Sequence, residues 1–189
     1  MNTEERDKEV RGKVFAAVER LTTQFRDESD RGAVLVAAAM IENSLNDLLR
    51  IYLAPQPSAT DSLFDGPNAP LASFAAKIDV AHRIGIISDK FARDLHLIRR
   101  IRNDFAHSAT SCEFSAQSVG DRVAALVRSN GILERSPSFI KKHGEPSTRD
   151  RFFNAVSWML YFLDSERVRI VPVKPRDAEF GYVATLDEA

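Results

Sequence analysis

The sequence is short of the residues that build disulfide-linked, metal-binding or membrane-spanning proteins. It has one cysteine, Cys112, so no internal disulfide can form, and it lacks the Cys/His spacings of zinc sites. Its N-terminus is charged and has no signal-peptide core, and its longest run of small apolar residues, 32–41, is too short to span a bilayer. We therefore expect a cytoplasmic protein with no metal, no cofactor and no membrane association.

An excess of charge of either sign is also missing. Lysine and arginine total 26 against 27 for aspartate and glutamate, so the net charge of −1 gives no bulk attraction to nucleic acid. Basic clusters occur at 99–102 and 141–143, but solvated surface faces commonly carry such clusters. Glycine-rich phosphate loops, Gly-x-Ser-x-Gly and His-Glu-x-x-His are absent, which removes the commonest nucleotide-binding, hydrolase and zinc-protease patterns.

What the sequence does contain is apolar residues at helical spacing along most of its length. Hydrophobic residues make up 44% of the chain, which is enough for a sizeable core. The three- and four-residue spacing predicts six helices, at about 3–25, 30–53, 71–83, 89–107, 118–129 and 148–164. The candidate N-caps are Ser29 or Asp30, Ser88 or Asp89, and Thr148.

These patterns predict an all-α protein: a compact bundle of about six helices with no sizeable sheet. We expect a single domain over 1–189, with its core at about 28–165 and a C-terminal tail at 166–189. The last predicted helix is apolar around most of its circumference, so it is either central in the bundle or buried between subunits. In the tail, 168–173 has the composition of an extended segment, but Pro172 bars it from a central strand.

The fourth predicted helix ends in the segment 102–107, Arg-Asn-Asp-Phe-Ala-His. At about 100° per residue from Phe91, the apolar stripe of this helix lies between about −80° and 40°. Arg102 falls inside that stripe, at about 20°. Asn103 and His107 fall on the opposite side, at about 120° and 160°. The segment therefore has one basic residue directed towards the core and two polar residues directed away from it.

An arginine inside an apolar stripe needs an anionic partner, because an unpaired buried guanidinium costs several kcal/mol. The preceding long helix offers Asp30 and Glu42, and we predict that one of them meets Arg102. Asp104 or the asparagine before it can orient the His107 imidazole. One interpretation is thus purely structural: a buried ion pair and a histidine favoured by the helix dipole. A joint site needs a helix end, a bend or a second subunit, because Arg102 and His107 diverge by about 140° on a straight helix.

Five stretches and Glu42 together carry a resemblance to a known family. The stretches are Glu-Ser-Asp-Arg-Gly at 28–32, Gly-Pro-Asn-Ala-Pro-Leu at 66–71, Phe-Ala-Ala-Lys-Ile at 74–78, Gly-Ile-Ile at 85–87 and Leu-Ile-Arg-Arg-Ile-Arg-Asn-Asp-Phe-Ala-His at 97–107. They cover about residues 28–108 and resemble the MltR family, named for the mannitol operon repressor. The resemblance implies a compact helical regulator of transcription that lacks a standard DNA-binding domain and acts through protein partners.

The segment 102–107 also resembles the Arg-x4-His motif of HEPN domains, many of which are ribonucleases in toxin–antitoxin and phage-defence systems. In those domains paired subunits bring the arginine and histidine together to cleave RNA without a metal. The resemblance implies that His107 transfers protons, Arg102 stabilises charge on the phosphate and Asn103 helps to position it. The nucleophile in that chemistry is the 2′-hydroxyl group of the RNA itself.

Three functions therefore compete: a regulator with a protein partner, a HEPN-type ribonuclease or its inactive relative, and a direct DNA binder. The turn between the third and fourth predicted helices has the Ala-x3-Gly spacing of a helix-turn-helix, at Ala81 and Gly85. We disfavour direct DNA binding because the second of these helices also carries a long buried stripe. A homodimer is expected, since both the nuclease geometry and the apolar last helix call for one.

Overall fold

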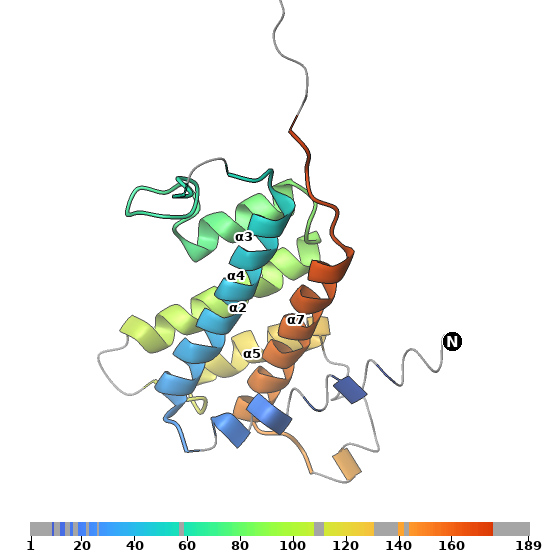
Figure 1. Cartoon of the computed structure of the whole chain (residues 1–189). Helices are drawn as coiled ribbons and strands as arrows, with labels where there is room; N and C mark the ends of the chain where they lie inside the picture. The colour runs from blue at the N-terminus through green and yellow to red at the C-terminus, as the bar shows by residue number, and fades with distance from the viewer. Residues whose placement is uncertain are drawn as a thin grey trace, which may run out of the picture.

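The computed structural model describes residues 27–56, 59–107, 112–130, 140–141 and 144–175, with scattered positions from 9 to 25. All secondary structure within these ranges is helical, arranged as a compact bundle (Figure 1). The helices are α2 (Asp30–Tyr52), α3 (Phe74–Arg83), α4 (Asp89–His107), α5 (Gln117–Asn130) and α7 (Thr148–Arg169). The predicted all-α bundle without a sizeable sheet is confirmed for the described residues.

Four of the described helices begin where a serine caps them, and three of these caps share one geometry. Ser29, Ser73 and Ser88 each accept a hydrogen bond from the backbone N–H three residues further on, at 3.1, 3.1 and 3.3 Å. The predicted starts of α2 and α4 are therefore confirmed. Helix α3 begins at Phe74 rather than at 71 because the cap lies at Ser73. Most of the first predicted helix, 3–25, lies outside the described residues.

Helix α7 differs from its predicted form at both ends. Its N-cap is Ser147 rather than Thr148, and Asp150 returns a hydrogen bond to the Ser147 backbone to complete a capping box. The helix continues to Arg169, so the predicted tail boundary at 166 falls inside it. Residues 170–175 follow without regular structure, and 176–189 lie outside the described residues.

Helices α2 and α7 lie side by side and run in the same direction (Figure 1). At their starts, Arg149 of α7 is ion-paired with Asp30 of α2. Near their ends, Arg167 of α7 lies 3.6 Å from Asp47 of α2. The two helices are thus in contact along most of their length.

Helix α4 runs in the opposite direction, across α2. Its first turn contacts the end of α7, where the ring centroids of Phe91 and Phe162 are 4.5 Å apart. Its last turn reaches the start of α2, where Arg31 donates a hydrogen bond to the Ala106 carbonyl at 2.6 Å. Helix α3 packs on α2 and α4, and α5 packs on α4 and α7. The segment 102–107 is therefore placed between the starts of α2 and α5.

One apolar core joins these helices. Its largest fully buried side chains are Ile41, Leu45, Leu48, Leu49, Ile78, Leu95, Ile98, Ile101, Phe105, Leu126, Phe152 and Phe153. Helix α2 is long and apolar enough to cross a membrane by length and composition. However, eight of its residues are buried in this core and it contacts α3, α4 and α7. Its apolar character is therefore explained by its central position, which agrees with a soluble protein.

Much of the apolar circumference of α7 is covered within the chain. Helices α2 and α5 pack on it, and Phe152 and Phe153 are buried in an aromatic cluster with Phe114. Among the described residues of α7, the large apolar side chain that remains exposed is Val168. Of the two locations predicted for this helix, the structure has the central one. Trp158, Leu160, Tyr161 and Phe162 of this helix are half-buried.

Candidate functional site

Arg102 lies at the surface and not in a buried ion pair. It is exposed, and it donates a hydrogen bond to Asn103 Oδ1 at 3.2 Å. The prediction that Asp30 or Glu42 meets Arg102 is wrong. In the last turns of α4 the buried side chains are those of Ile98, Ile101 and Phe105. They centre at about −50° on the helical wheel, so Arg102 lies about 70° away, where its long side chain reaches water.

The two carboxylates expected beside the motif arginine are held by other cations. Glu42 accepts a hydrogen bond from Lys77 Nζ at 2.8 Å, which joins α2 to α3. Asp30 is ion-paired with Arg149 and also accepts the backbone N–H of Phe114 at 3.1 Å. Both carboxylates therefore connect helices of the bundle, and neither is paired with Arg102.

The residues in the middle of the segment 102–107 contact other helices of the bundle. Asp104 is ion-paired with Arg122 of α5, so it does not orient the histidine as predicted. Phe105 is fully buried, and the carbonyl of Ala106 accepts a hydrogen bond from Arg31. These contacts hold the last turn of α4 in a defined position.

The remaining three side chains of the segment reach solvent. Arg102 and His107 are exposed, and Asn103 is half-buried. Helix α4 continues without a break through His107, so Arg102 and His107 stay about 140° apart around its axis. Neither the bend nor the early helix end needed for a joint site within one chain is present in α4. A second subunit is the one predicted route that is left.

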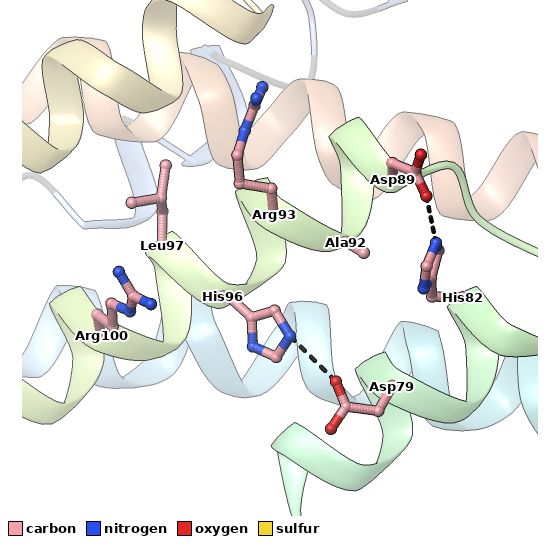
Figure 2. A pocket seen from close by; sticks show the side chains of 8 residues that line it. All are labelled: Asp79, His82, Asp89, Ala92, Arg93, His96, Leu97 and Arg100. Atoms are coloured by element: carbon pink, nitrogen blue, oxygen red, sulfur yellow. Dashed lines mark hydrogen bonds and ion pairs between the residues drawn. The ribbon is translucent and has the colours of Figure 1, made fainter.

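A pocket of about 310 Å³ between α3 and α4 was not predicted from the sequence. Two histidine–carboxylate pairs line it, as Figure 2 shows. His82 is paired with Asp89, and His96 Nε2 lies 3.2 Å from Asp79 Oδ1. Each pair joins α3 to α4, so both require the two helices to be packed.

Two arginines and two apolar residues of α4 complete the lining of this pocket. Arg93 and Arg100 are exposed, Ala92 is buried and Leu97 is half-buried. Figure 2 shows the Arg100 guanidinium at the opposite end of the pocket from the His82 imidazole. The helical wheel of α4 could have found the basic side of this pocket, since it places both arginines on the outer face.

The described residues offer no metal cluster and no activated thiol. Within the described ranges, no three His, Cys, Asp or Glu side chains come together closely enough to hold a metal ion. Burial, and then the nearby carboxylate of Asp104, raise the pKa of the Cys112 thiol. The thiol therefore stays protonated at neutral pH, and Cys112 is a poor nucleophile. In the basic cluster at 141–143, Lys142 and His143 lie outside the described residues.

No known protein family, curated protein or solved structure matches the chain.

Proposed function

We propose that this protein is a metal-independent ribonuclease of the HEPN type, active as a homodimer, with Arg102, Asn103 and His107 as its catalytic residues. The observation that supports it most is the exposure of Arg102. A buried ion pair would have explained this arginine structurally, but its hydrogen-bond partner is the neutral amide of Asn103. Asp104 and the backbone carbonyl of Ala106 are engaged with the bundle, whereas the exposed side chains of the segment are available to a ligand.

The chemistry of these side chains suits cleavage of a phosphodiester. His107 takes the proton of the ribose 2′-hydroxyl, whose oxygen attacks the adjacent phosphorus. The bond to the 5′-oxygen breaks, that oxygen takes up a proton, and a 2′,3′-cyclic phosphate is left. The guanidinium of Arg102 stabilises the negative charge on the phosphate, and the Asn103 amide positions it.

A second copy of the chain completes the site. In one chain Arg102 and His107 lie on different sides of α4. A twofold dimer that pairs the two α4 ends places Arg102 of one copy beside His107 of the other, and does so twice. The proposal therefore links cleavage to dimer formation.

The test is incubation of purified protein with single-stranded RNA in EDTA. We expect cleavage with cyclic-phosphate ends, and a loss of about 100-fold to 10,000-fold in rate for Arg102→Ala and for His107→Ala. Arg20→Ala, which removes an exposed arginine outside the motif, is the matched control and should cleave like the wild type.

Three outcomes would overturn the assignment. The first is the absence of cleavage at high enzyme concentration, and the second is cleavage that both motif variants retain. The third is a monomer in sedimentation at micromolar concentration, because one chain cannot bring the two side chains together.

A second candidate is an MltR-like regulator that acts through a protein partner, and exposed valines after the core favour it. Val168, Val171 and Val173 are 88%, 77% and 42% exposed. The backbone N–H of Val173 donates to the carbonyl of Tyr52 at 2.8 Å, which holds this segment beside the end of α2. Apolar side chains presented at the end of α7 and on the held segment that follows it suit docking to another protein.

The two functions can be distinguished by expressing variants of the protein in cells that lack the gene. If the protein is a regulator, the Val171→Asp variant should largely fail to restore the transcript profile of these cells. The His107→Ala variant should restore it as the wild type does. A ribonuclease gives the reverse result. Leu63→Asp, at another exposed apolar position (43%), is the matched control and should behave like the wild type in both cases.

A further inference from the structure

The outer face of α4 carries a line of basic and polar side chains. Arg93, His96, Arg100, Asn103 and His107 follow one another at three- or four-residue spacing, between about 120° and 200° on the helical wheel. The line is about 21 Å long. Three of its members are exposed and two are half-buried, so the line faces solvent. It joins the pocket between α3 and α4 to the last turn, where His107 lies.

The pocket has the size and lining of a site for one nucleotide. Its volume of about 310 Å³ is at the lower end of the range for small-molecule sites. Ala92, Leu97 and the His96 ring offer surfaces for a base or a sugar, and histidine is among the side chains on which RNA bases stack. Arg93 and Arg100 are two helical turns apart on the exposed face, where phosphates on either side of that nucleotide can reach them.

The two carboxylates of the pocket lie beside its histidines, and Arg93 lies 3.8 Å from a further carboxylate, that of Asp94. Asp79 is hydrogen-bonded to His96, and Asp89 is paired with His82. Figure 2 shows both carboxylates directed at their histidines, with the Arg100 guanidinium at the other end of the pocket. The arrangement therefore places the guanidinium of Arg100 at one end of the pocket, where the strand would enter, and the carboxylates towards the other.

We propose that this pocket is a binding subsite for single-stranded RNA, which holds one nucleotide while Arg93 and Arg100 bind the neighbouring phosphates. The line of side chains on α4 then guides the strand towards His107. The identity of the ligand rests on the proposed ribonuclease function. The subsite itself lies outside the segment 102–107 and can be tested without cleavage.

The experiment measures binding of a fluorescent 2′-O-methyl RNA 12-mer, which cannot be cleaved, by anisotropy in EDTA over a series of salt concentrations. We expect Arg93→Ala/Arg100→Ala to bind roughly tenfold more weakly. The slope of log K against log salt should fall by about 1.4, since each phosphate contact to a single strand contributes about 0.7. The matched control, Arg20→Ala/Arg169→Ala, makes the same change in net charge and should bind like the wild type.

His96→Ala distinguishes the pocket from a merely basic helix. If a base stacks on the imidazole, this variant should bind about fivefold more weakly, or worse, at every salt concentration, with the slope unchanged. Thermal unfolding by circular dichroism checks that each variant is folded. A folded His96→Ala protein with wild-type affinity would overturn the nucleotide pocket.

The outcomes also separate this proposal from the ribonuclease proposal. If the wild type fails to bind the 12-mer at low salt, or if the variant without Arg93 and Arg100 binds as tightly, the subsite is wrong, whatever the cleavage assay shows. If binding depends on these arginines but no RNA is cleaved, the subsite stands and the catalytic assignment of Arg102 and His107 falls.

Discussion

Phe105→Ala is expected to lower the free energy of unfolding by about 3–5 kcal/mol, although it lies within the proposed catalytic segment. The ring is fully buried, and its centroid lies 5.3 Å from that of Phe114, which in turn contacts Phe152 at 5.4 Å. Removing it leaves a cavity between α4 and Phe114. Urea unfolding followed by circular dichroism measures the change.

The exposed members of the same segment provide the contrast. Arg102→Ala and His107→Ala should each change the free energy of unfolding by less than about 0.5 kcal/mol, because both side chains are exposed. If either variant proved as unstable as Phe105→Ala, its side chain would have a structural role, and a loss of RNA cleavage in that variant could no longer be assigned to catalysis. The stability measurement is therefore needed before the cleavage rates are interpreted.

Asp30→Ala is expected to lower the free energy of unfolding by about 2 kcal/mol. Its carboxylate pairs with Arg149 and accepts the backbone N–H of Phe114, so the substitution breaks an ion pair and leaves a backbone donor unsatisfied. Both charged side chains are about a quarter exposed, and we therefore expect less than the 3–5 kcal/mol typical of a fully buried pair.

A double-mutant cycle isolates the interaction of Asp30 with Arg149. Arg149 also donates to the carbonyls of Phe25 and Glu28, at 2.6 and 3.0 Å, so its own substitution reports more than the ion pair. We expect a coupling energy of about 1–2 kcal/mol for this pair. The exposed pair of Arg167 and Asp47 joins the same two helices and should couple by less than about 0.5 kcal/mol. Equal coupling in the two pairs would show that the contact at Asp30 does not hold the helices together.

Features that depend on residues three or four positions apart could be predicted from the sequence. The serine caps of α2 and α4 are local hydrogen bonds, and they are found where expected. The buried positions of α2, such as Ile41, Leu45 and Leu48, follow from the spacing of apolar residues on one helix. Neither feature requires knowledge of the rest of the chain.

The partners of charged residues could not be predicted in this way. Asp30 is paired with a residue 119 positions away, and Glu42 with one 35 positions away. The sequence offered several arginines and lysines at equal plausibility for each carboxylate. The choice of Arg102 was wrong because a helical wheel assumes one uniform apolar face, whereas the buried face of α4 turns along its length as it crosses its neighbours.

By itself, the sequence determined an all-helical bundle, its core positions and the segment that carries Arg102, Asn103 and His107, because periodicity and caps act within a few residues. That Arg102 faces water follows only from the tertiary structure. So does the pairing of Asp30, Glu42 and Asp104 with cations on other elements of the bundle. The contact between Asp79 and His96 at the pocket also depends on how the helices pack. Burial and ion pairing depend on which surfaces pack together, and helices far apart in the sequence supply those surfaces.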